Sequence, residues 1–221
     1  MMNLFKLIIR EMKIHMSSLT NLWSFVSLFF LGILIFVFAV GSETNNLSQL
    51  YLPIVWVIFL FSLILGAETF LLEDHTDGSL KELQFLGYSK EIIILAKSIS
   101  MWIIYIIPSI FIIPLFSIMF SINLNYLIFI IINILLASPS LILIAIISGL
   151  FALQLKKNRI LQFVIIIPFY IPPLIFGTMH NYNQSNNILE NHNFFILIAI
   201  FFITLPLTLF IGKLLLKEIY K

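Results

Sequence analysis

The sequence contains no cysteine and few charged residues. Because none of its 221 residues is cysteine, disulfides, thiolate metal sites and a cysteine nucleophile are excluded. Asp, Glu, Lys and Arg make up 10% of the chain, against about 25% in ordinary soluble domains. The sequence also lacks a Walker A loop, a metalloprotease helix and the pattern around a serine nucleophile. We therefore expect no catalysis, no metal and no cofactor on this chain itself, and no binding to nucleic acid.

What the sequence has in abundance is apolar residues. They make up 61% of the chain, the mean hydropathy is +1.12, and no Asp, Glu, Lys or Arg occurs between Ser98 and Leu155. A helix of roughly 20 apolar residues crosses a hydrocarbon layer of about 30 Å. Uninterrupted Ile, Leu and Phe runs lack the alternation of β-barrel strands. The composition predicts an all-α polytopic membrane protein with a single membrane domain over residues 1–221.

Turn-forming and charged residues divide the apolar sequence into six predicted transmembrane helices. The cluster from Ser121 to Asn125 is the one turn signal inside the long uncharged stretch, so it separates two spans. No small-residue cleavage site follows the first span, so we expect that span to be retained and not removed as a signal peptide. The predicted spans are Leu22 to Val40, Leu52 to Leu72, 98 to 120, 126 to 153, Ile160 to Thr178 and Phe194 to Leu216.

The basic residues predict the orientation of these spans. All 12 Lys and Arg residues fall on one side: before the first span, in the second and fourth connections, or at the end of the last span and beyond it. The three other connections contain no basic residue, and their acidic residues are Glu43 and Glu190. Because basic loops stay on the cytoplasmic side, both termini are predicted to be cytoplasmic.

Residues 1–16 are predicted to form an amphipathic helix at the membrane surface. Lys6, Arg10 and Lys13 recur at helical spacing among apolar residues. In one interpretation the helix is a topology anchor on anionic headgroups. In the other it also braces a cytosolic partner.

The connection between spans two and three, residues 73–97, is the main candidate functional segment. Six of the ten acidic residues lie between Glu68 and Glu91. Glu73 and Asp74 follow the end of span two, where the helix dipole disfavours a carboxylate by about 0.3–1 kcal/mol, and anionic lipids on this side favour cations. This placement indicates a protein partner with basic groups. The alternative is that the acidic residues are simply solvated.

Local signals in this connection predict a short helix. Asp77-Gly78 is a turn pair, and Ser79 with Glu82 fits a capping box. Such a helix could couple the membrane domain to a motor protein that this chain lacks, or lie on the headgroups. Leucines line one face (Leu80, Leu83 and Leu86), Gly87 is expected to end the helix, and Ser89 to cap the next one. The predicted coupling residues are Glu73, Asp74, Asp77, Gly78, Ser79, Leu80, Glu82 and Leu83.

Three further sets of residues are candidates inside the membrane or opposite the coupling segment. Glu68 lies in an apolar run, where it either snorkels to a cytoplasmic cation or relays protons. His180 and His192 share one external connection and either ligate haem iron or are solvated. Prolines that would bend spans, and so permit gating, are Pro108, Pro139, Pro168, Pro172 and Pro173, with Ser138 and Ser140 placed to satisfy groups freed at Pro139.

The order of these features resembles the CcmB family, the haem exporter B proteins of cytochrome c maturation, within the ABC-2-type permeases. The specific parts are Asp77-Gly78-Ser79-Leu80 in the coupling segment and Ile171-Pro172-Pro173-Leu174-Ile175-Phe176 in span five. The sequence departs from the family at Thr69, where a basic residue is expected, and at Ala137, where glycine is expected. Supporting matches are Trp56, Glu68, Asp74, Leu83, Leu95-Ala96-Lys97, Trp102, Pro108, Pro114-Leu115, Ser138-Pro139, Leu141 and Pro168.

The resemblance implies a permease of a bacterial or mitochondrial inner membrane that pairs with an ABC ATPase subunit. ATP would bind that partner, haem would be the transported or handled ligand, and the permease would form a homodimer with further haem-handling subunits nearby. Two alternatives remain at this stage: an ABC-2 permease for another amphiphile such as a lipid or drug, and a membrane scaffold that transports nothing.

Overall fold

The protein is all-helical in the computed structural model, which describes residues 4–17, 19–40, 47–120, 122–154, 159–178 and 192–219. Within these ranges the chain forms helices joined by short turns and no strand. The helices are α1 (Leu4–Ser17), α2 (Leu19–Val40), α3 (Leu47–Thr76), α4 (Ser79–Phe85), α5 (Lys90–Met119), α6 (Leu124–Gln154), α7 (Arg159–Thr178) and α8 (His192–Ile219).

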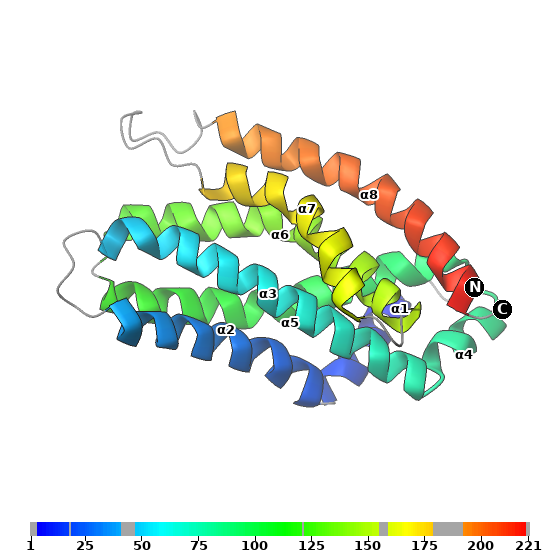
Figure 1. The fold of residues 1–221 in the computed structure, drawn as a ribbon. Coiled ribbons are helices and arrows are strands. Elements are labelled where there is room, and N and C mark those ends of the chain that lie inside the picture. Colours follow the sequence, from blue (N-terminus) through cyan, green and yellow to red (C-terminus); the bar gives the residue numbers. More distant parts are fainter. Residues whose placement is uncertain are drawn as a thin grey trace.

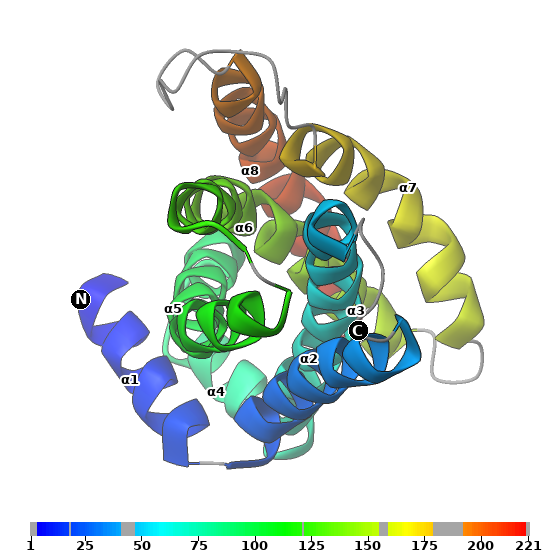
Figure 2. The same ribbon diagram turned by 90° about the vertical axis from the view of Figure 1, so that its left-hand side faces the viewer.

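Six of the helices run back and forth between the two ends of one bundle. Figure 1 shows α2, α3, α5, α6, α7 and α8 alternating in direction, with both chain termini at the same end. Helix α4 lies at this end too, and α1 runs crosswise beside the bundle in the end view of Figure 2. We call this the charged end, because every Lys and Arg whose side chain the structure describes belongs to α1, α4 or the adjacent ends of α5 and α8.

The helices match the predicted spans closely, and they confirm an all-helical polytopic membrane protein. Five are long and apolar enough to cross a membrane, namely α2, α3, α5, α6 and α8. The fifth predicted span coincides with α7, in which the side chains that the structure describes form the apolar stretch Ile166–Thr178. Helix α3 differs from the prediction in one useful respect. It continues past Leu72 to Thr76, so Glu73 and Asp74 are helical residues and not loop residues.

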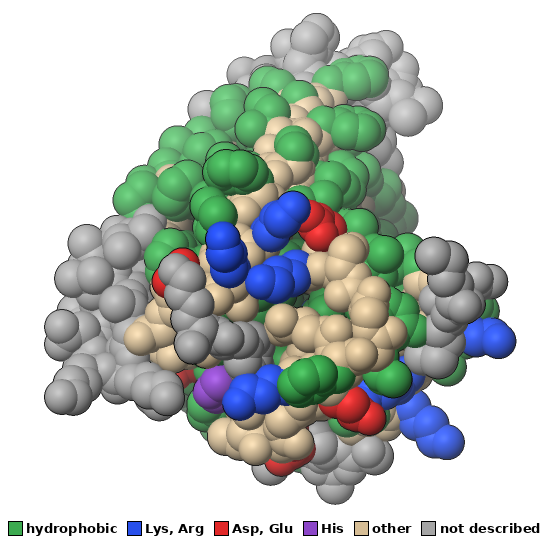
Figure 3. Space-filling view, turned by 90° about the vertical axis from the view of Figure 1, so that its right-hand side faces the viewer, with side chains coloured by type: hydrophobic (Ala, Val, Ile, Leu, Met, Phe, Trp, Pro, Cys, Tyr) green, Lys and Arg blue, Asp and Glu red, His purple; other side chains and the backbone are tan. Residues whose placement is uncertain are grey.

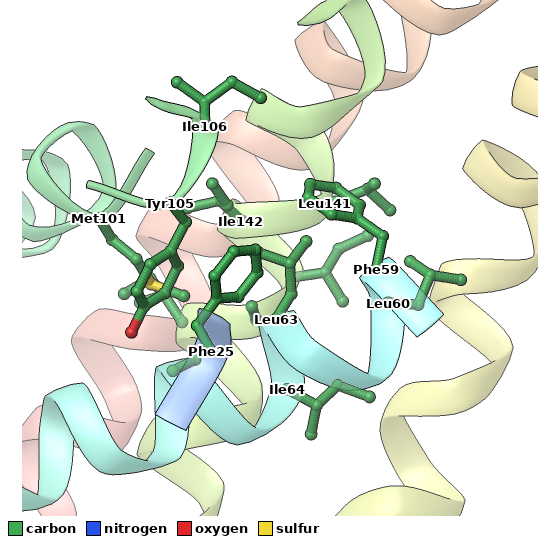
Figure 4. Close-up of a cluster of buried hydrophobic side chains, with 14 of the residues drawn as sticks. Phe25, Phe59, Leu60, Leu63, Ile64, Met101, Tyr105, Ile106, Leu141 and Ile142 are labelled. Atoms are coloured by element: carbon green, nitrogen blue, oxygen red, sulfur yellow. The ribbon is translucent and has the colours of Figure 1, made fainter. Parts of the chain in front are cut away.

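An aromatic cluster holds the middle of the bundle together (Figure 4). The ring of Phe25 on α2 stacks on Tyr105 of α5 with centroids 4.5 Å apart, and it meets Phe59 of α3 edge-on at 6.0 Å. Tyr105 also donates its hydroxyl hydrogen to the Gly66 carbonyl over 2.8 Å, so this buried oxygen is not left unpaired. Helix α2, which follows α1 in the chain, therefore packs directly against α5, which follows α4.

The prolines lie inside helices that continue through them. Pro139 cannot donate to the carbonyl of Leu135, four residues earlier. The hydroxyl of Ser138 donates to that carbonyl instead, over 3.2 Å, and accepts the indole hydrogen of Trp102 over 2.8 Å. The predicted role of Ser138 is confirmed. Ser140 donates to the Ala137 carbonyl over 2.7 Å, which is not one that Pro139 frees. Pro108 lies inside α5, and Pro168, Pro172 and Pro173 lie inside α7.

Helix α7 approaches α3 closely through a glycine. A Cβ atom placed on Gly177 would lie 2.3 Å from Cζ2 of Trp56, a distance that no real side chain tolerates. Trp56 is fully buried. The absence of a side chain at Gly177 therefore decides how closely α7 packs on α3.

Candidate functional site

Helix α1 has three sides with different surroundings. Lys6 and Lys13 are exposed, with Arg10 on the same side. A second side presents apolar residues such as Phe5 to the exterior. The third side is buried against the bundle and consists of Leu7, Glu11 and His15, one helical turn apart. A helix that only rested on lipid headgroups would have no reason to bury a carboxylate and an imidazole, so α1 is a docked part of the fold.

The buried side of α1 leads into a network of ionic side chains at the charged end. Lys97 of α5 is 2% exposed, and its ammonium group donates to Glu11 Oε2 over 2.6 Å and to Asp74 Oδ2 over 2.5 Å. Arg10 donates to Glu11 Oε1 over 2.9 Å and to Glu82 Oε2 on α4 over 3.0 Å. We call Arg10, Glu11, His15, Asp74, Glu82 and Lys97 the charged junction, which joins α1, α3, α4 and α5.

The imidazole of His15 completes this network. Its Nε2 lies 3.3 Å from Asp74 Oδ2 and 3.7 Å from Glu11 Oε2. Its ring stacks on Phe70 with centroids 3.6 Å apart. The same Phe70 ring lies 5.7 Å from the Lys97 ammonium group, a cation–π distance. With His15 protonated, the charged junction carries three positive and three negative groups.

The surroundings shift the pKa values of the two ionisable groups that α1 contributes to the buried core of the junction. Burial alone would raise the pKa of Glu11, but the nearby imidazole of His15 and the charge of Lys97 outweigh it and hold the pKa below its ordinary 4.5. Burial alone would lower the pKa of His15, but the nearby carboxylates of Asp74 and Glu11 outweigh it and raise the pKa above 6.5. The junction therefore favours the ionised form of both groups.

The charged junction is an ion-pair network and not a metal site. Ligand atoms of Glu11, His15 and Asp74 lie within 4.8 Å of one another, which is close enough to surround a metal ion. However, Lys97 Nζ already bonds one oxygen of each carboxylate. An ammonium group thus occupies the place that a metal cation would take.

The structure corrects the interpretation of Asp74. The sequence argument assigned its basic partner to another protein, whereas the partner is Lys97 of the same chain. Asp74 is 3% exposed, so it is not available for direct contact with a docked protein. The Lys97 ammonium lies at the C-terminal end of α3, where it offsets the repulsion between the carboxylate and the helix dipole.

Helix α4 is present as predicted, but a different residue begins it. The predicted capping box is wrong, because the N-cap is Gly78, with φ 76°, and no side chain caps the helix. The hydroxyl of Ser79 donates instead to Asp74 Oδ1 over 2.9 Å. At the other end Gly87, with φ 83°, closes the helix as predicted, and Tyr88 N donates to the Leu83 carbonyl over 3.2 Å. Both glycines have positive φ, which explains why glycine occupies each position.

The predicted coupling residues divide into buried and outward-facing groups. Leu80 and Leu83 are buried and fasten α4 to the bundle, as the predicted apolar face requires. Asp77 and Glu82 are exposed, and Glu73, Gly78 and Ser79 are intermediate. Leu86 was assigned to the buried face but is exposed, because the helix ends at Phe85 and the chain turns there.

The sequence analysis missed the apolar part of the outer surface of α4. Phe85 is 89% exposed and Leu86 lies next to it, also exposed, at the charged end. The charged side chains of Lys81 and Glu82, about one helical turn earlier, are exposed, as is Asp77 just before the helix. The signal was present in the sequence as an apolar pair just before Gly87, of which Leu86 was assigned to the leucine face and Phe85 to no role. We call Asp77, Lys81, Glu82, Phe85 and Leu86 the α4 surface.

Figure 3 looks directly onto the charged end. Basic and acidic side chains gather on this face, while apolar side chains cover the flank of the bundle behind it. One exposed ion pair, between Lys213 of α8 and Glu91 of α5 at 2.6 Å, ties the last helix to the same end. The molecule thus has an apolar body with one charged face from which α4 projects.

Comparison with known proteins places this arrangement in a family. The family described as CcmB protein matches residues 2–216. The chain belongs to the CcmB family. Among its relatives, Heme exporter protein B of Haemophilus influenzae is 28% identical over 173 residues, 78% of each chain. Heme exporter protein B of Pseudomonas aeruginosa is 28% identical over 179 residues, 80% of each chain. An uncharacterised protein of Rickettsia conorii is 31% identical over 226 residues, 100% of this chain and 99% of the relative.

The two departures from the CcmB pattern both lie at helix contacts. Thr69 shares a hydrogen bond of 2.9 Å with Ser24, so a neutral pair links α2 and α3 at this point. Its hydroxyl also lies 3.0 Å from the Gly66 carbonyl. Ala137 is fully buried in α6. Glu68, one residue before Thr69, is half-buried near the charged end of α3.

The structure does not describe the side chains of the two histidines that were predicted to ligate haem. His180 lies outside the described residues, and of His192 the structure describes the helical backbone alone. The suggestion that they ligate haem stays a prediction.

Proposed function

We propose that this chain is the permease subunit of an ABC transporter that acts in haem export for cytochrome c maturation. Family membership over residues 2–216 supports the assignment, together with relatives that carry the name Heme exporter protein B. In this proposal the chain is a non-catalytic membrane subunit, and a partner ATPase binds and hydrolyses ATP. Haem is the transported or handled ligand.

The proposed topology has six spans with both termini in the cytoplasm. It is supported by the alternating course of six helices in Figure 1, which makes α7 the fifth span although its described apolar part is short. The basic side chains of the charged end favour the cytoplasm. Reporter fusions at Asn45 and Asn186 should report the outer side and one at Asn158 the cytoplasm. The reverse pattern would refute both the topology and the docking site below.

The α4 surface is the proposed docking site for the ATPase. The observation that carries this proposal is Phe85, an almost fully exposed aromatic residue at the charged end, where the proposed topology places it in water. Exposed aromatic residues rimmed by charge are typical anchors of protein interfaces. The two buried leucines and the Ser79–Asp74 hydrogen bond hold α4 in place, so the surface is preformed.

The docking site is tested by removing its aromatic anchor. Phe85→Ala is expected to weaken ATPase binding by about 2 kcal/mol, roughly thirty-fold, measured by titrating the ATPase onto the permease in detergent. Asp77→Lys should weaken it further by reversing a charge at the rim. The matched control is Phe202→Ala on α8, because Phe202 is also strongly exposed but lies in a membrane span. Equal binding by the Phe85 and Phe202 variants would exclude α4 as the docking site.

The remaining parts of the proposal concern the cell. The chain is proposed to form a homodimer in the bacterial or mitochondrial inner membrane and to work with further subunits that handle haem. Deleting the gene should abolish covalent c-type cytochromes and spare b-type ones, since haem synthesis continues without delivery. Unaltered c-type haem staining would remove the haem assignment and leave an ABC-2 permease for another amphiphile.

A further inference from the structure

We propose that Lys97 is a positioning residue that makes α1 and α4 move as one body, so that the N-terminal helix transmits the partner ATPase's motion into the membrane together with α4. This inference rests on the proposed function, because it assumes an ATPase docked on the α4 surface. It assigns α1 a mechanical role that a membrane anchor does not have.

The first step concerns how α4 is held. The helix has seven residues and no side-chain cap, so it is too short to act as a rigid lever by itself. Two polar contacts tie it to other helices. Ser79 donates to Asp74 of α3 over 2.9 Å, and Glu82 accepts from Arg10 of α1 over 3.0 Å. A force applied to α4 therefore acts on α3 and α1 directly.

The second step is that both contacts lead to the same ammonium group. Asp74 accepts from Lys97, and Arg10 is paired with Glu11, which also accepts from Lys97. Water does not compete for these bonds, because the Lys97, Glu11 and Asp74 side chains are each at most 3% exposed. The Arg10–Glu82 pair alone would be weak, since Glu82 is mostly exposed. The Arg10–Glu82 pair can transmit a force because Arg10 also bonds Glu11, which the buried Lys97 ammonium group holds in place.

The third step concerns the helices that receive the motion. Helix α1 is followed in the chain by α2, and α4 by α5. Phe25 of α2 stacks on Tyr105 of α5 inside the membrane part of the bundle. If α1 and α4 move together, these two spans receive the same displacement and their stacked rings need not separate. If α1 and α4 moved apart, each cycle would have to break the Arg10–Glu82 pair, together with either the Ser79–Asp74 bond or the buried bonds of Lys97.

A neutral variant tests the role of Lys97. Lys97→Met, Glu11→Gln and Asp74→Asn together remove the charges while nearly preserving side-chain size, so the protein is expected to fold. In complexes with the ATPase reconstituted into liposomes, this variant should bind the ATPase with wild-type affinity through the α4 surface. It should lose at least tenfold in ATP hydrolysis rate per complex, whereas a purely structural ion pair would leave that rate unchanged. A wild-type rate in the neutral variant would overturn the proposal.

Cross-linking tests directly whether α1 and α4 move as one body. Because the chain contains no cysteine of its own, the reagent can join only the cysteines that are introduced into it. Because Glu82 belongs to the α4 surface, the cross-link is made in complexes that already hold the ATPase, and retention of the ATPase is checked afterwards. In such complexes Arg10→Cys with Glu82→Cys, joined by a short bismaleimide, should hydrolyse ATP at least as fast as the same complex before cross-linking. The controls are the two single-cysteine variants treated with the same reagent. A tenfold loss of rate in the cross-linked protein alone would show that α1 and α4 separate, and would overturn the proposal.

The two proposals fail in distinguishable ways. Co-purification of the ATPase with the wild-type chain is measured first, because its absence refutes the proposed function and this inference with it. Co-purification together with a normal rate in the neutral variant refutes the role of Lys97 alone.

Discussion

Replacing Lys97 by methionine should destabilise the protein strongly, although the two side chains have similar volumes. The substitution leaves no large cavity, so the cost comes from charge. Glu11 and Asp74 would remain buried without the ammonium group that now lies 2.6 Å and 2.5 Å from them. Removing one partner of a buried ion pair typically costs about 3–5 kcal/mol.

Neighbouring groups place the expected cost at the lower end of that range. His15 lies 3.3 Å from Asp74 and carries a positive charge when protonated, so part of the compensation remains. We expect a loss of about 3 kcal/mol. At about 2–4 °C per kcal/mol for a chain of this length, the melting temperature should fall by roughly 6–12 °C.

The assay is a fluorescence-detected thermal shift of the purified protein in detergent at neutral pH. The control is the neutral triple variant, in which amides replace both carboxylates. It should recover most of the loss, because no unpaired buried charge is left. A shift below about 2 °C for Lys97→Met, the size expected of a surface substitution, would refute the burial and pairing described above.

Three further predictions concern His15, Gly177 and Ser138. The raised pKa of His15 contributes stability below its ordinary value of 6.5, and this is lost as pH rises through the higher folded value. The melting temperature should therefore fall as the pH rises above 6.5 in the wild type and change less in His15→Gln; an equal slope in both would contradict the assignment. Gly177→Ala should lower the melting temperature by forcing α7 away from Trp56. Adding Trp56→Leu to this variant should recover part of the lost melting temperature. If the effects of the two substitutions on the free energy of unfolding simply add, the contact between Gly177 and Trp56 is contradicted. Ser138→Ala should cost about 1–3 kcal/mol by leaving the Leu135 carbonyl unpaired, with Ser140→Ala as the neighbouring control.

The sequence was sufficient to predict the membrane helices because span length and hydropathy are local properties. Each predicted span coincides with a helix, and Gly87 and Ser89 were assigned correctly as cap residues. For Ser89 the Ile92 amide donates to its hydroxyl over 3.4 Å. The capping box failed because Gly78 already begins α4, which leaves the Ser79 hydroxyl free to bond Asp74. The local sequence pattern could not show whether the Ser79 hydroxyl caps α4 or bonds Asp74.

The charged junction was beyond sequence analysis for a different reason. Whether a charge is buried depends on its partner, and Glu11 lies 86 residues from Lys97 in the chain. A weak signal did exist, since Leu7, Glu11 and His15 share one side of α1 away from the basic side chains. Nothing in that spacing identifies α5 as the place where the side docks. Phe85 was not predicted as a functional residue because it lies outside the leucine repeat that defines the buried face of α4.

The separation of Glu11 from Lys97 in sequence has a consequence during synthesis. Ribosomes add roughly 5–20 residues per second, so Lys97 is made roughly 4–17 seconds after Glu11. During this interval α1 has already been made, but the group that neutralises its buried side does not yet exist. Its basic side chains and exposed apolar side can hold it among the lipid headgroups while Glu11 and His15 remain in water. The bonds of Lys97 that fasten α1 to the bundle can therefore form only after Lys97 has been made.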